Sequence, residues 1–379
     1  MLNIYKKRVL LIFVLLILNI VNVNAEENTI IDEYAKSIGV EEAKNDVPQA
    51  AKEAAKNAGI NEIDPLKPGE LVNINAVGRV IFNISKLLFV KNIKLYVSLI
   101  GIILIYALFD ALKSSFGSES LKKVFTVCTV SGAILIIYDA VSSCYTGATE
   151  VIEQLTLFMK GMIPVMASAT IFSGYPVSAT VSQSLIFTIM EIMAQFNATI
   201  FMPLVTVYFA LLIAGSISQN ISLRGVTDLA KNLFMWGSGL LLTVFLGVMS
   251  LQTVLSSSAD SVTRRSVKYA MGSFIPVLGG LLSESVDMVL SCAISVKSIV
   301  GVFGIGIIVF TVITPVIGII INMFFVNITC GVSDILGAEG ITTFLRGVQS
   351  VLGMLLTLIL TLSVMSILVF VIFINVGKG

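Results

Sequence analysis

The stretch that decides the fold is Ser350-Val-Leu-Gly-Met-Leu-Leu-Thr-Leu-Ile-Leu-Thr-Leu-Ser-Val-Met-Ser-Ile-Leu-Val-Phe-Val-Ile-Phe-Ile374, a run of 25 residues without one charged side chain. A helix needs about 20 apolar residues to cross the hydrocarbon core of a bilayer, so this run predicts a transmembrane helix. Runs of the same kind recur along the chain. They occupy residues 95–112, 124–145, 198–217, 233–255 and 299–326. The sequence therefore predicts an all-α, polytopic helical membrane protein.

Composition supports the same class and excludes others. Hydrophobic residues make up 56% of the 379 residues and charged residues 12%, whereas soluble domains contain about 25% charged residues. The 24 bases are matched by 23 acids, so no nucleic-acid partner is expected. Histidine is absent, which removes Ser-His-Asp triads and the usual zinc sites. No P-loop, GxGxxG or HExxH motif occurs, and we expect no catalytic residue, cofactor or metal.

The N-terminal segment 1–25 has the features of a secretory signal peptide. Lys6, Lys7 and Arg8 form a basic region, an apolar run follows, and the segment closes with a small residue at Ala25. The alternative is an uncleaved anchor helix. Both interpretations place the next segment outside the cytoplasm.

Residues 26–93 form a polar arm, which we expect to be extracytoplasmic and amphipathic. The arm contains 11 of the 23 acids and 8 bases. Gln49–Asn57 has high helix propensity, and Gly59 is a plausible helix stop. Residues 71–84 have apolar side chains at helical spacing, as in a helix at a membrane surface or against a partner. The arm is either a loosely ordered translocated segment or a docking element for an extracytoplasmic partner.

Loop charges orient the first spans but leave the later ones ambiguous. Lys113, Lys122 and Lys123 place loop 113–123 in the cytoplasm. Loops 218–231 and 256–269 are both net positive, although one predicted span, 233–255, separates them in the sequence. One of the two is misplaced, or one is an interfacial helix.

Two apolar regions contain helix-breaking residues. Gly174 and Pro176 interrupt region 161–197, and Pro276 interrupts region 270–296. Each region is either a single poor span or a broken, re-entrant hairpin, which requires cover by protein or a watery cavity.

An internal repeat is the most informative feature. Met162-Ile-Pro-Val165 recurs as Phe274-Ile-Pro-Val277, and Pro203 recurs as Pro315, both at an offset of 112. The stretch 225–231 recurs as 340–346, at an offset of 115. These landmarks predict two leading transmembrane helices in 94–149, followed by membrane repeats 150–258 and 262–374.

Each repeat has a Pro-containing broken element, a Pro-containing span, an amphipathic interfacial helix and a final span. The predicted helix breaks are Pro164, Pro203, Pro276 and Pro315. In the amphipathic helix of the first repeat, Arg224, Asp228 and Lys231 lie opposite an apolar face. Duplicated membrane units with broken helices are typical of transporters with a pathway at the repeat interface, and a duplicated scaffold is the alternative. The repeats can be parallel or inverted.

Acids within apolar stretches are candidate functional sites because their burial is costly. The candidate intramembrane polar sites are Asp139, Glu191, Glu284 and Asp287. Glu284 and Asp287 are three residues apart, so one helix face presents both. A cation or proton site is one interpretation, and inter-helix hydrogen bonding is the other. The four cysteines lack CxxC spacing and are expected to be buried thiols.

The chain resembles the stage III sporulation protein AE family of endospore-forming bacteria. The residues that carry the resemblance are the signal-like start, the acidic arm and Tyr269-Ala-Met-Gly-Ser-Phe-Ile-Pro-Val-Leu-Gly-Gly-Leu-Leu-Ser-Glu-Ser-Val-Asp287. Gly331-Val-Ser-Asp334 and Phe344-Leu-Arg346 match as well.

The resemblance implies a multi-pass protein of the mother-cell membrane around the forespore. It implies a subunit of a sporulation-specific, secretion-like channel or feeding apparatus, which forespore development needs after engulfment. The implied partners are other membrane proteins of the stage III sporulation operon, ring-forming intermembrane proteins and a secretion-type ATPase, besides the lipid bilayer. An autonomous secondary transporter with a pathway at the repeat interface is the alternative function.

Overall fold

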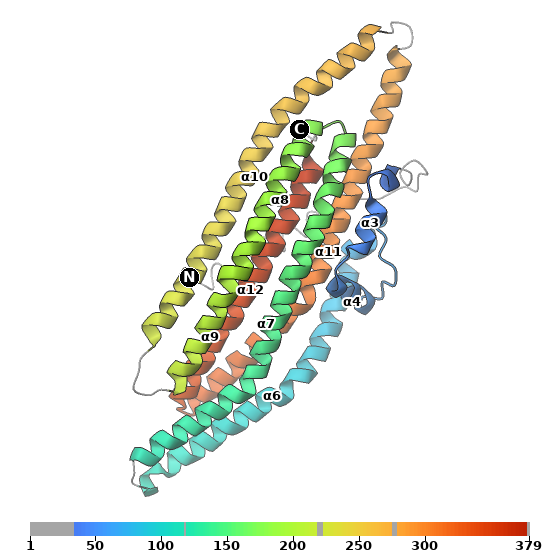
Figure 1. Cartoon of the computed structure of the whole chain (residues 1–379). Coiled ribbons are helices and arrows are strands. Elements are labelled where there is room, and N and C mark those ends of the chain that lie inside the picture. The colour runs from blue at the N-terminus through green and yellow to red at the C-terminus, as the bar shows by residue number, and fades with distance from the viewer. Residues whose placement is uncertain (1–33, 117–118, 218–222, 275–278, 377–379) are drawn as a thin grey trace.

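The computed structural model describes residues 34–116, 119–217, 223–274 and 279–376, with side chains left out at 43, 112–116, 119–123, 253–274 and 279–289. Within these residues the secondary structure is helical throughout (Figure 1). Six helices in this part of the chain are long and apolar enough to cross a membrane, which confirms the all-α polytopic class. The predicted signal peptide and cleavage site lie outside the described residues.

The arm contributes three short helices, α3 (Val40–Asn45), α4 (Gln49–Asn57) and α5 (Gly69–Val72), and its residues 74–93 are the start of a long helix that continues past the predicted boundary at 93. The predicted helix at 49–57 is confirmed, and Gly59 follows it with a φ of 81°, which favours glycine. The alanine face of α4 is fully buried, and the α4 backbone at Ala50 donates to Gln154 Oε1 at 3.1 Å. The described part of the arm therefore packs against the helix bundle of its own chain.

The first two long helices are α6 (Ile74–Phe116) and α7 (Glu119–Phe172). They contain the predicted leading spans 95–112 and 124–145. Both continue well beyond those spans, and α7 passes through position 150, where the first predicted repeat begins, and through Pro164. Pro164 therefore does not end a helix.

Region 161–197 is not a single helix. It contains the last turns of α7 and the whole of α8 (Pro176–Phe196), joined by a turn in which Gly174 has a φ of 86°. Pro176 is placed at the start of α8, where its missing N–H is not needed. The breaking residues of this region thus make a hairpin between two long helices.

The helix that follows is continuous through a change of winding. A π-helical segment, η1 (Asn197–Phe201), joins α8 to α9 (Met202–Ile217). Pro203 comes two residues after η1 and has no N–H for the preceding turn, and π-helical turns absorb such mismatches. The winding of the helix therefore changes just before Pro203, and the helix continues through this residue.

Three helices complete the chain: α10 (Arg224–Phe274), α11 (Gly279–Ile335) and α12 (Glu339–Asn375). The predicted loop at 256–269 is wrong because α10 continues through it, and the stretch 248–271 has no Gly or Pro to end the helix. Because residues 256–269 are helical, the chain no longer has two positive loops separated by a single span, and the ambiguity of the loop charges disappears. Helix α11 passes through Pro315, so this residue is no break either, whereas Pro276 lies outside the described residues.

Helix α12 is the centre of the bundle. In the most apolar stretch of α12, 83% of the residues are buried. The corresponding share is 67% in α11, 28% in α10 and 22% in α6. Figure 1 shows α12 enclosed by α7, α9, α10 and α11. The run that decided the fold is therefore apolar because it packs against helices, while α6 and α10 turn most of their apolar residues outward.

The equivalent helices of the two predicted repeats run in the same direction. Helix α10 begins at Arg224 and α12 at Glu339, which are 115 residues apart (339 − 224), the offset of the sequence landmarks. Helices α9 and α11 both lead to the lower end of the bundle in Figure 1, and α10 and α12 both return from it. The predicted interfacial helices are not separate elements but the first turns of α10 and α12.

Candidate functional site: a charged cavity between α9, α10 and α12

The first turns of α10 have the opposite orientation to the one expected for an amphipathic helix. The expected apolar face points outward, with Val226 52%, Leu229 58% and Leu233 53% exposed. Arg224 and Asp228, from the polar face, line a cavity between helices instead. The matching turns of α12 bury the expected apolar face, since Ile341 to Val348 includes Phe344 and Leu345 at 0% exposure. Lipid on the outer side of α10 explains why an apolar face is outward there.

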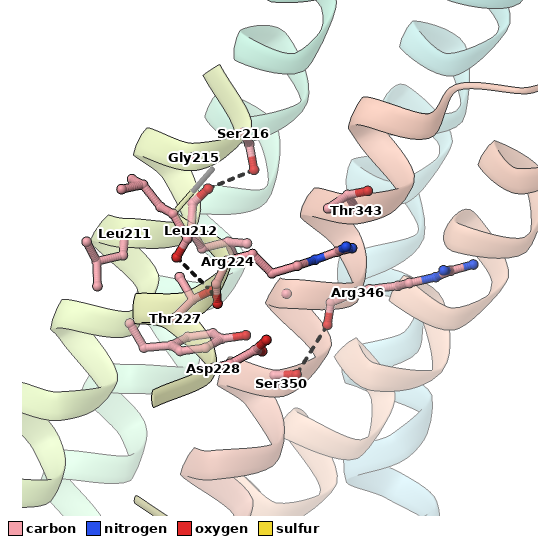
Figure 2. A pocket seen from close by; sticks show the side chains of 13 residues that line it. Leu211, Leu212, Gly215, Ser216, Arg224, Thr227, Asp228, Thr343, Arg346 and Ser350 are labelled. Atoms are coloured by element: carbon pink, nitrogen blue, oxygen red, sulfur yellow. Dashed lines mark hydrogen bonds between the residues drawn. The ribbon is translucent and has the colours of Figure 1, made fainter. Parts of the chain in front are cut away.

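The cavity has a volume of about 350 Å³ and is partly open to the surface. Its walls come from the end of α9, the start of α10 and the start of α12 (Figure 2). Hydroxyl groups gather on these walls, and Tyr208, which carries one of them, is 5% exposed. The polar side chains of the lining are Tyr208, Ser216, Arg224, Thr227, Asp228, Thr343, Arg346 and Ser350.

The charges of the cavity fall into two groups. On the far side of α12, Arg346 Nη2 lies 2.6 Å from Asp334 Oδ2, so the charge of Arg346 is paired with that of Asp334. Lys231 Nζ donates to Ser350 Oγ at 3.1 Å, which links α10 to α12. Arg224 reaches across toward α12 (Figure 2), and neither it nor Asp228 forms an ion pair with any residue that the structure describes. One cation and one anion therefore remain available to a ligand.

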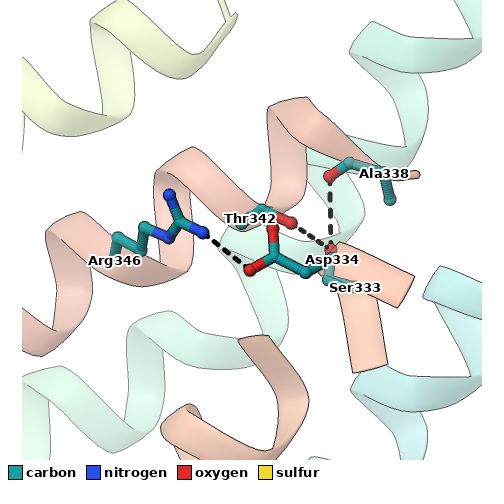
Figure 3. Close-up of polar contacts among 5 residues, drawn as sticks. All are labelled: Ser333, Asp334, Ala338, Thr342 and Arg346. Carbon is teal, nitrogen blue, oxygen red and sulfur yellow. Dashed lines mark hydrogen bonds and ion pairs between the residues drawn. The ribbon is translucent and has the colours of Figure 1, made fainter. Parts of the chain in front are cut away.

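The turn between α11 and α12 fixes one wall of the cavity. Thr342 Oγ1 donates to Ser333 Oγ at 2.9 Å, and Ser333 Oγ donates to the carbonyl oxygen of Ala338 at 3.2 Å (Figure 3). Ser333 and Ala338 are fully buried, and Gly337 turns the chain with a φ of 70°. This buried chain of hydroxyls, with the ion pair of Arg346 outside it, holds α12 against α11.

Two of the four predicted acids have clear surroundings. Glu191 on α8 forms an ion pair with Lys160 on α7 at 2.6 Å, which fits the inter-helix bonding interpretation. Asp139 on α7 is exposed and lines a second cavity of about 370 Å³, together with Lys91 and Pro315. Glu284 and Asp287 belong to α11, but their side chains lie outside the described residues. The structure therefore does not gather Asp139 and Glu191 into one site.

Two polar clusters escaped the sequence reasoning. Lys297 is wholly buried, and its Nζ donates to the carbonyl oxygen of Val376 at 2.6 Å. Lys297 could have been identified from the sequence, because it is the one charged residue between Asp287 and Asp334. In the other cluster, Tyr96 Oη donates to Asn322 Oδ1 at 2.9 Å and Asn322 Nδ2 donates to Cys144 Sγ at 3.4 Å. Only the fold brings these three positions together.

Comparisons with known proteins agree on one family. The sequence model of the family described as "Stage III sporulation protein AE (spore_III_AE)" matches residues 62–377. Stage III sporulation protein AE of Bacillus subtilis (strain 168) is 26% identical over 254 residues, which cover 67% of this chain. The match spans 64% of that relative's length, less than two thirds. No solved structure matches the chain. With most of its length matched by the family model, the chain belongs to the stage III sporulation protein AE family.

Proposed function

We propose that this protein is a membrane subunit of a sporulation-specific, secretion-like channel that links mother cell and forespore. The family supports a role in sporulation, and the six long apolar helices support a multi-pass membrane position. The channel and its place in the mother-cell membrane are the parts we propose.

The observation that carries the proposal is the burial of α12. A helix, rather than a polar passage, fills the middle of the bundle, with 83% of its apolar window buried. This favours a path for solute between this chain and other copies or partners over a path through the centre of one chain. The burial of α12 therefore supports a subunit role.

The partners we propose are the other membrane proteins of the stage III sporulation operon, ring-forming intermembrane proteins and a secretion-type ATPase. The arm, which we place outside the cytoplasm, covers α7 and α11 through α4. Its outer side carries exposed charges, including Glu53 and Lys56, and is the surface we assign to intermembrane partners.

A clean deletion tests the proposal. The deletion strain should engulf the forespore and then stop, and the tagged full chain should co-purify with the other channel components. Normal spores from the deletion strain would contradict the proposal.

The position of the cavity favours a second candidate, an autonomous secondary transporter. The cavity lies between α10 of the first predicted repeat and α12 of the second, and the interface between repeats is where such transporters have their pathway. Proteoliposomes that contain this chain alone should then show solute or ion flux, and Glu284→Gln or Asp228→Asn should abolish it. An absence of flux across a broad substrate set favours the subunit.

A further inference from the structure

The cavity between α9, α10 and α12 presents opposite charges one helical turn apart. Arg224 and Asp228 are four residues apart on α10, so their side chains leave the same face about 6 Å apart along the axis. Both line the cavity beside Tyr208, and neither forms an ion pair with the other or with another described residue. A ligand that carries both a negative and a positive charge pairs with both side chains, whereas Asp228 repels a simple anion.

The cavity lies at the level of the ends of two apolar helices. Helix α9 has no charged residue and ends at Ile217, and α10 begins at Arg224. Ends of apolar helices lie among the lipid headgroups. A headgroup therefore has direct access to the cavity from the side of the bilayer.

The outer side of α10 accepts acyl chains. Val226, Leu229 and Leu233 are each more than half exposed, and Trp236 follows at 70% exposure. A soluble zwitterion gains nothing from this surface, whereas a phospholipid bound by its headgroup lays apolar chains along it.

We propose that the cavity binds the headgroup of a zwitterionic phospholipid with a phosphate diester and a primary amine, the phosphatidylethanolamine type. The Arg224 guanidinium donates to the phosphate oxygens, and the Asp228 carboxylate accepts from the ammonium group. The two-carbon arm between phosphate and amine spans roughly one helical turn, about 5.4 Å. Phosphatidylcholine has no N–H to donate, and phosphatidylglycerol has no cation for Asp228.

The test measures lipid retained by the purified full chain in native mass spectrometry. The probes are phosphatidylethanolamine, phosphatidylglycerol and phosphatidylcholine with identical acyl chains. Wild type should bind phosphatidylethanolamine about tenfold more tightly than the other two, the effect of one charge-assisted hydrogen bond. Asp228→Asn should bring phosphatidylethanolamine down to the level of phosphatidylcholine. Arg224→Gln should weaken all three about tenfold.

The controls are Arg79→Gln and Glu150→Gln, the same kinds of change at exposed positions that do not line this cavity. Both should keep the wild-type preference. Equal binding of the three lipids by wild type overturns the proposal without relying on any variant, and so does a preference that survives Asp228→Asn. Soluble phosphoethanolamine that competes as well as the lipid overturns the lipid as the source of the headgroup.

Discussion

The ammonium group of Lys297 lies 2.6 Å from the carbonyl oxygen of Val376, the residue that caps the C-terminal end of α12. The same group lies 5.5 Å from the centre of the Tyr175 ring in the turn between α7 and α8. One buried cation thus joins α11 to the negative end of α12 and to the hairpin beside it.

Lys297→Met should destabilise the protein by about 2 kcal/mol, because the helix end loses its cation and the carbonyl of Val376 loses its donor. Thermal unfolding in detergent measures the change. Lys86→Met, at an exposed position of α6, is the matched control and should leave the midpoint near the wild-type value. A Lys297→Met protein as stable as wild type would show that the contact contributes nothing.

Ser333→Ala should cost about 1–3 kcal/mol, because it leaves the buried Thr342 hydroxyl without its acceptor and removes one of the two hydrogen bonds to the Ala338 carbonyl oxygen, which keeps the Thr342 N–H. Asp334→Asn, in the exposed ion pair next to it, should cost much less. Chemical unfolding of the two variants gives the comparison. A larger loss for Asp334→Asn would mean that the ion pair, not the hydroxyl chain, holds the turn.

Gly347→Ala should destabilise the bundle by about 1–3 kcal/mol, because a Cβ at this position collides with the Leu212 side chain of α9. Shortening the neighbour in the double variant Gly347→Ala, Leu212→Ala should recover part of the loss. Gly331→Ala is the control, since its Cβ meets nothing within 4 Å and alanine favours the helix. Equal thermal midpoints for the two glycine variants would refute the close approach of α9 and α12.

Tyr34→Phe should raise stability by up to about 1 kcal/mol, because the buried Tyr34 hydroxyl has no hydrogen-bond partner among the described residues and the ring contact with Phe172 is kept. Burial raises the pKa of Tyr34 to about 12. A raised pKa stabilises the folded state fully below pH 10, and this contribution is lost as the pH rises from 10 toward 12. The variant should lack that loss in unfolding measured across this pH range. An identical alkaline decline in wild type and Tyr34→Phe would contradict the assignment.

The sequence was sufficient for the existence of the long helices but not for their ends. An apolar run predicts a span because lipid leaves few alternatives, and all six predicted runs lie in long helices. Helix ends depend on local breakers, and Pro164 and Pro315 did not act as breakers but lie inside continuous helices, where proline is tolerated in membrane proteins. Gly174 and Pro176 did act, because they form a turn.

Periodicity gave the faces of the amphipathic turns but not their surroundings. The same pattern is buried at Phe344 on α12 and exposed at Leu229 on α10. In a soluble protein the apolar face is inward, whereas beside lipid either side is permitted. The charged cavity was therefore hidden from sequence reasoning, although Arg224 and Asp228 were already recognised as one polar face.

The central place of α12 has a consequence for biogenesis. This helix follows the other five long helices in the chain, yet α7, α9, α10 and α11 pack around it. During synthesis α6 to α11 leave the ribosome first, so their inward surfaces stay uncovered until α12 arrives. A chain that stalls before residue 339 should therefore remain unassembled and become a substrate for membrane proteases.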